Sequence, residues 1–135
     1  MRDHGELARV IRSTLDERGL AYEQTDRGLV VTLPGTHKQK TLVNLMLGDH
    51  ALRIEAFVMR RPDEHREELY AWLLTRNAKM YGVAFSIDAA GDVYLTGRVP
   101  LTSVNPDELD RLLGAVLEYA DGSFDAMLEI GFPSA

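Results

Sequence analysis

Six short runs of alternating apolar and polar residues, grouped in pairs, constrain this chain more than any other feature. Within each pair the connection is a short turn, and these turns contain Gly28, Gly48 and Gly91. Short turns join antiparallel neighbours, whereas parallel strands need long crossover connections. The pattern therefore predicts an antiparallel sheet built from hairpins. The expected strands cover residues 20–24, 29–33, 41–47, 51–59, 83–87 and 93–99.

Three further segments have the spacing of amphipathic helices. Their apolar residues recur every three or four positions, and each segment opens with residues that favour a helix start. We predict that Leu69 and Leu73 face the core from the second helix, with Trp72 beside them. The first predicted helix starts at Asp3 and Glu6 and ends at Gly19, and the second starts at Pro62 and ends at about Met80. The third is long, starts at Asn105, Pro106 and Glu108, and bends at Asp121-Gly122.

The resulting order is α-β-β-β-β-α-β-β-α. Runs of hairpin-linked strands, with helices set apart from them, are typical of an α+β fold with an antiparallel sheet and helices packed on one face. The 135 residues are enough for one contiguous core, and no linker or repeat interrupts the pattern. We therefore predict a single domain over residues 1–135.

Charge and composition exclude several classes of function. The net charge is −6 and cysteine is absent, which argues against broad nucleic-acid binding, disulfides and thiolate metal sites. The beginning of the chain shows no basic segment followed by an apolar run, and no stretch approaches the roughly 18 apolar residues that span a bilayer. We expect a cytoplasmic protein without a membrane or nucleic-acid partner. Acidic residues concentrate after position 102, most simply as a solvated helix face.

Catalytic motifs are not apparent. Residues 35–41 have the residue types of a phosphate loop without its spacing, and no serine lies in a nucleophile elbow. His65 and Glu68 are three residues apart on the second predicted helix and could share a metal, but a second helix with matching ligands is missing. A solvated helix start that favours acids is the better interpretation. We predict no enzymatic activity and no cofactor.

The strand at 51–59 has one apolar face and one mixed face. Leu52 and its neighbours at every second position are apolar, whereas the alternate positions carry Arg53, Glu55, Phe57 and Met59. Soluble monomers seldom leave large apolar residues clustered in the open. These four residues are therefore our candidates for a protein interface.

The segment around the last hairpin resembles a known family. The residues that carry the likeness are Leu73-Leu74, Asn77, Gly82, Phe85, Asp88, Gly91, Val93, Leu95 and Val99-Pro100-Leu101. They are similar to the YbjN-domain family, bacterial proteins described as sensory transduction regulators, which look like class I type III secretion chaperones in fold. The resemblance implies a non-catalytic interaction module, often dimeric. Asp121-Gly122 within the last helix departs from the family pattern.

Two hypotheses about function follow from these observations. The first is a protein-binding module, chaperone-like or a regulatory adaptor, that acts on a partner of unknown identity and forms a homodimer through the mixed sheet face and the acidic last helix. The alternative is a small-ligand sensor with a pocket between sheet and helices, in which His50, Arg53 or Arg98 holds an anion. A metal-dependent hydrolase at His65 and Glu68 is the weakest candidate.

Overall fold

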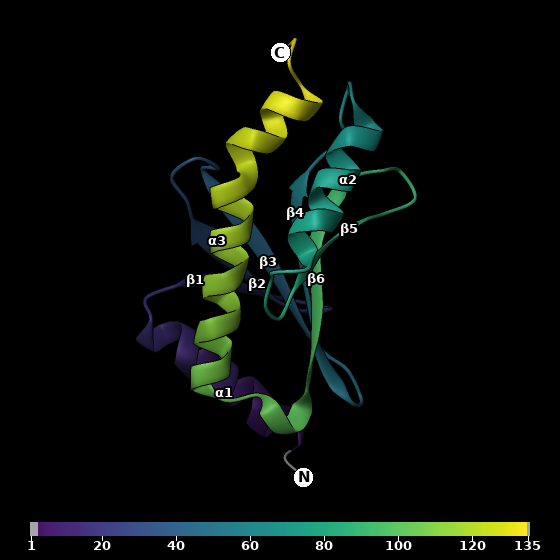
Figure 1. Ribbon diagram of the computed structural model, residues 1–135. Coiled ribbons are helices and arrows are strands. Elements are labelled where there is room, and N and C mark those ends of the chain that lie inside the picture. The colour runs from purple at the N-terminus through teal and green to yellow at the C-terminus, as the bar shows by residue number, and fades with distance from the viewer. Residues whose placement is uncertain (1–2, 135) are drawn as a thin grey trace.

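A computed structural model describes residues 3–134 as one sheet with helices on one of its faces (Figure 1). The helices are α1 (His4–Glu17), α2 (Arg66–Asn77) and α3 (Pro106–Gly131), with a short 3-10 turn at Leu101–Ser103. The strands are β1 (Ala21–Thr25), β2 (Gly28–Pro34), β3 (Lys40–Leu47), β4 (Ala51–Met59), β5 (Ala84–Ile87) and β6 (Val93–Pro100). The predicted order of elements is therefore confirmed.

The six strands form one antiparallel sheet in the order β1-β2-β3-β4-β6-β5. Each hairpin keeps its two strands as neighbours, and β6 adds to β4, so that β5 becomes an edge. In Figure 1 the long helix α3 crosses in front of the sheet, with α1 near its lower end and α2 in front of β5 and β6. The predicted α+β class, with helices packed on one sheet face, is confirmed.

The core lies between this sheet face and the three helices. Every second residue of the strands points into it, including Val31, Val43 and Ile54, and the predicted helical stripes meet them there. Leu69 and Leu73 are buried as predicted, while Trp72 is only half-buried at the margin of the core. The guanidinium of Arg76 lies over the Trp72 ring, 4.6 Å from its centroid. All three helices therefore contribute side chains to one hydrophobic core cluster with the sheet.

Two of the three predicted helix starts are confirmed. The Asp3 carboxylate accepts a hydrogen bond from the Glu6 amide at 2.7 Å, and the Asn105 side chain accepts one from the Glu108 amide at 2.9 Å. The prediction that Pro62 occupies the first turn of α2 is wrong, because this helix begins at Arg66.

The delayed start of α2 has a tertiary cause. Pro62 is buried against Gly131, near the end of α3, and the Glu64 amide donates to the Gly131 carbonyl at 3.0 Å. The chain then passes through His65, whose φ of 54° is left-handed, before the helix begins. Docking on α3 therefore overrides the local helix signals at Pro62.

Met59 is a second correction, because this residue is buried with only 5% of its surface exposed. The pairing of β4 with β6 slips between Phe57 and Met59, which pair with Tyr94 and Val93 respectively. A β-bulge places two successive residues against one on the partner strand, so the alternation of faces is interrupted. Val58 and Met59 consequently both turn inward, and the prediction that Met59 lies on the mixed face is wrong.

Asn77 at the end of α2 protects the edge strand β5. Its amide nitrogen donates to the Phe85 carbonyl at 3.0 Å, and its Oδ1 accepts from the Phe85 amide at 2.7 Å. These two bonds occupy the main-chain groups of Phe85 that point away from β6. An edge strand covered in this way is a poor template for pairing with another chain.

Asp121 fastens the loop between β2 and β3 to α3. One oxygen of its carboxylate, Oδ1, accepts hydrogen bonds from the amides of Thr36, His37 and Lys38 at 2.8, 2.8 and 2.9 Å. Successive amides that converge on an anion form a nest. The loop that lacked phosphate-binding spacing therefore binds a carboxylate of its own chain. Helix α3 continues through Asp121-Gly122 to Gly131.

The nest makes a prediction about pH. Hydrogen bonds from these amides lower the pKa of Asp121 from its ordinary 3.8, and the bond from the Lys38 amide has the largest effect. A carboxyl group whose pKa is lower in the folded than in the unfolded protein stabilises the fold at pH values above its pKa in the unfolded protein. This contribution is lost as the pH falls through the pKa of the group in the folded protein. Asp121→Asn should therefore lower the melting temperature at neutral pH, and the difference from wild type should shrink below about pH 4.

Hydrogen exchange at the amides of residues 36–38 measures the same contact locally. Asp125→Asn is the matched control, because Asp125 contacts the loop only through an exposed pair with the His37 imidazole at 2.7 Å. Equal melting curves for Asp121→Asn and wild type at neutral pH would contradict this role.

Candidate protein-binding surface

No helix among residues 3–134 covers the second face of the sheet (Figure 1). The strands present alternate residues there, and their register across β2, β3, β4 and β6 arranges these residues in rows. We call this surface the open sheet face. It comprises Val30, Thr32, Leu42, Asn44, Met46, Arg53, Glu55, Phe57, Tyr94, Thr96 and Arg98.

One row of the open sheet face is apolar and aromatic. Phe57 pairs with Tyr94 across β4 and β6, and their rings meet edge to face with centroids 5.5 Å apart. Leu42 on β3 lies one residue beyond the Val43–Ala56 pair, which brings it to the same end of the face. Leu42 and Phe57 are each 43% exposed. Burial raises the pKa of Tyr94, with Asp88 adding to the effect, so this row remains uncharged at neutral pH.

A second row is cationic. Arg53 and Arg98 pair directly across β4 and β6, and both side chains are exposed. Glu55 and Thr96 lie opposite each other in the row between the arginines and the aromatic pair. The structure thus places three predicted interface residues, Arg53, Glu55 and Phe57, on one uncovered surface. Their role in an interface remains a prediction.

Sequence reasoning missed Leu42 and Tyr94 in this surface. The alternation of β6 had already placed Tyr94 opposite the core-facing residues, but the neighbour of β6 was not predicted. Only the β4–β6 pairing shows that Tyr94 joins Phe57. A partner strand that is distant in sequence leaves little local signal.

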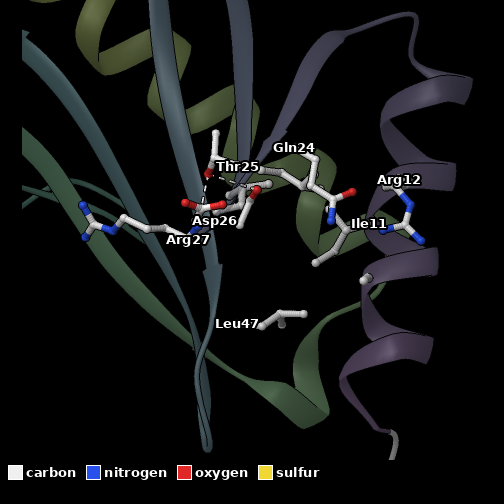
Figure 2. Close-up of a pocket in the computed structure, with 11 residues that line it drawn as sticks. Ile11, Arg12, Gln24, Thr25, Asp26, Arg27 and Leu47 are labelled. Atoms are coloured by element: carbon white, nitrogen blue, oxygen red, sulfur yellow. Dashed lines mark hydrogen bonds between the residues drawn. The ribbon is translucent and has the colours of Figure 1, made fainter.

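A pocket of about 230 Å³ lies between α1 and the turn that joins β1 to β2. Figure 2 shows Ile11 and Arg12 on α1, with Leu47 across the pocket and Gln24 above it, while Arg27 extends away from α1. The floor is apolar and the rim is polar. The pocket lies where α1 meets the sheet.

The predicted ligand contacts do not line this pocket. Arg53 and Arg98 point to the opposite side of the sheet, and the exposed His50 lies in the turn between β3 and β4. Arg12 and Arg27 are cations that line this pocket, together with the acidic Asp26. The sequence gives no signal that distinguishes Arg12 from the other polar residues of its helix. A ligand role for His50, Arg53 or Arg98 therefore does not involve this pocket, and it stays a prediction.

An apolar groove of about 270 Å³ lies between α2 and the edge strand β5. Its lining residues are Tyr70, Leu73, Leu74, Phe85, Ser86 and Ile87. Leu74 is 69% exposed and Ile87 is 48% exposed, so this is the second surface on which large apolar side chains meet solvent. The sequence indicated Leu74 only as a family residue.

Four of the seven acidic residues of α3 are engaged within the chain. Asp110 pairs with Arg18 at 2.9 Å, Asp125 contacts His37, Glu108 pairs with Arg111, and Asp121 fills the loop nest. Helix α3 lies over one face of the sheet (Figure 1), whereas Phe57 alternates with the core-facing residues of β4 and is exposed on the other face. Because the two surfaces lie on opposite sides of the sheet, one two-fold contact does not bury the open sheet face and α3 together.

The His65–Glu68 pair does not gain further ligands. Within residues 3–134, no group of three or more potential metal ligands comes together. His65 instead contacts the Ile130 carbonyl through Nδ1 at 3.0 Å, in the segment that docks on α3. None of the helices in this part of the chain is long and apolar enough to cross a membrane.

Solved structures with the same arrangement are found among secretion chaperones and their relatives. The ExsC–ExsE complex matches with a TM-score of 0.68 and 17% identity, over 94% of this chain and 97% of that one. The Yersinia pestis type III secretion chaperone SycH, in complex with a fragment of YscM2, matches with a TM-score of 0.59 and 15% identity, over 84% and 96%. The chain therefore has the type III secretion chaperone-like fold.

The family follows from the sequence. The model of the YbjN family, described as "Putative bacterial sensory transduction regulator", matches residues 8–129. The chain belongs to this family, and the resemblance predicted from the last hairpin is confirmed. The crystal structure of YbjN from E. coli matches with a TM-score of 0.64 and 17% identity, over 88% of this chain and 89% of that one. The protein Rv0487 of Mycobacterium tuberculosis is 47% identical over 135 residues, 96% of this chain and 74% of that protein.

Proposed function

We propose that this protein is a non-catalytic protein-interaction module of the cytoplasm, chaperone-like or a regulatory adaptor, and that it binds its partner through the open sheet face. The observation that carries the proposal is the apolar row of Leu42, Phe57 and Tyr94, on a face that no helix of residues 3–134 covers. Aromatic side chains supply much of the energy at protein interfaces. The folds of ExsC and SycH, each solved in a complex, support an interaction role.

Phe57→Glu tests this surface. The side chain is already 43% exposed, so the variant should fold, while a partner that buries this ring should bind at least about tenfold more weakly. Affinity capture from the native cells, followed by mass spectrometry, identifies proteins retained by wild type. Calorimetry with the purified partner then measures the loss.

Leu128→Glu is the matched control, because Leu128 is a comparably exposed apolar residue on α3, at 37%. A partner lost in Phe57→Glu and retained in Leu128→Glu supports the open sheet face. Full retention of every partner by Phe57→Glu would remove this surface from the proposal.

We further propose a homodimer that uses the groove between α2 and β5. Leu74 and Ile87 expose apolar surface there, and the Asn77 bonds to Phe85 favour contact through side chains over strand pairing. An isologous contact of this groove with its copy closes at two chains. This arrangement leaves the open sheet face free for a partner.

Leu74→Glu should then raise the dimer dissociation constant by about tenfold or more, since it places a carboxylate in a desolvated apolar contact. Sedimentation equilibrium over a range of protein concentrations measures it, with Leu128→Glu as the control. A wild-type protein that sediments as a monomer at all concentrations would end the homodimer proposal.

A small-ligand sensor is the second candidate function, and the pocket beside α1 supports it. Its apolar floor, with Arg12 at the rim (Figure 2), suits a small molecule with an apolar part and an anionic group. A metabolite screen by thermal shift should give a saturable rise in melting temperature that Arg12→Ala reduces and Arg53→Ala does not. A rise that persists in Arg12→Ala would place the ligand elsewhere.

A further inference from the structure

Arg53 and Arg98 are directly opposed cations on an uncovered surface. Like charges opposite each other in an antiparallel pair destabilise a sheet, and no ion pair is recorded for either side chain within residues 3–134. Within residues 3–134, Arg18, Arg60 and Arg111 have acidic partners. Most other arginines of this range have none, and it is the direct opposition across two strands that sets Arg53 and Arg98 apart. The cationic row therefore carries a local cost that an anion from outside would offset.

The cationic row has a fixed distance from the apolar row. Arg53 and Phe57 are four residues apart on β4, and Arg98 and Tyr94 are four apart on β6, with regular pairing between them. At about 3.3 Å per residue the two rows lie roughly 13 Å apart on one face. The open sheet face thus presents an apolar site and an anion-accepting site at a defined spacing.

Main-chain pairing with a partner is not available at either row. Strands β4 and β6 are interior strands, each with a neighbour on both sides. A partner is therefore recognised by its side chains, in contrast to strand addition at an open edge. Planar guanidinium groups bind carboxylates with two parallel hydrogen bonds, which favours Asp and Glu over neutral residues.

We infer that the open sheet face binds an acidic amphipathic segment of another protein, with an apolar side chain on the Leu42–Phe57–Tyr94 row and a carboxylate on the Arg53–Arg98 row. This inference rests on the proposed function and specifies the chemistry of its partner. A second copy of the chain is a poorer occupant, because four of the seven carboxylates of its α3 already have partners within the chain. Nucleic acid is also a poorer occupant, because Glu55 leaves these rows with a net charge of only about one.

Selection from a random library of displayed 16-residue peptides tests the inference without a known partner. Wild type should select peptides enriched in Asp and Glu beside apolar residues. The double variant Arg53→Gln/Arg98→Gln should lose the acidic enrichment. The matched double variant Arg9→Gln/Arg66→Gln, which removes the same charge from exposed positions on α1 and α2, should keep it. Synthetic peptides from the wild-type pool then give dissociation constants by fluorescence anisotropy.

Replacing the acids of a selected peptide with their amides should weaken its binding to wild type by about tenfold, and its binding to Arg53→Gln/Arg98→Gln by less than about twofold. Higher salt should weaken only the acidic form. Peptides that depend on Phe57 but show no acidic preference would overturn this inference and leave the proposed function standing. Failure to select any peptide that Phe57→Glu abolishes would count against both, and tighter binding of a single-stranded oligonucleotide through the same arginines would overturn the choice of partner.

Discussion

The burial of a single sheet face determines the remaining features of this molecule. Strand residues alternate between two faces, and α1, α2 and α3 all pack on the same one, so that Val31, Val43 and Ile54 are buried while Leu42, Phe57 and Arg53 are not. A sheet with helices on both faces would have near-continuous apolar strands. Here the alternation is retained, and the second face is built from side chains that contact water.

Two side-chain contacts to main-chain groups bring the helices into register with the sheet. Asn77 joins the end of α2 to β5 through both polar groups of Phe85, and Asp121 joins the middle of α3 to the β2–β3 loop through three amides. Apolar packing is not directional, whereas hydrogen bonds of this kind require defined positions. They fix where each helix lies along a sheet that would otherwise tolerate sliding.

Sequence reasoning predicted what is encoded locally and failed where distant segments meet. The caps at Asp3 and Asn105 depend on residues three positions apart, and the hairpins depend on short turns between consecutive strands. Both were predicted correctly. The start of α2 depends on Gly131, more than 60 positions later, and the inward turn of Met59 depends on a bulge opposite Val93. Of the candidate surface, Arg53, Glu55 and Phe57 followed from period-two alternation, whereas Tyr94 needed the β4–β6 register.

The placement of charge favours recognition on the face away from the helices. Acidic residues of α3 are mostly satisfied by Arg18, His37, Arg111 and the loop nest, so the negative net charge of the chain does not by itself define a docking site. The arginine pair on β4 and β6 forms no ion pair within the described chain, with Glu55 in the next row, and it lies in line with an exposed aromatic pair. Opposed like charges destabilise a sheet. A partner that supplies a carboxylate therefore reduces the repulsion between Arg53 and Arg98, and this adds to the binding energy from its contact with Phe57.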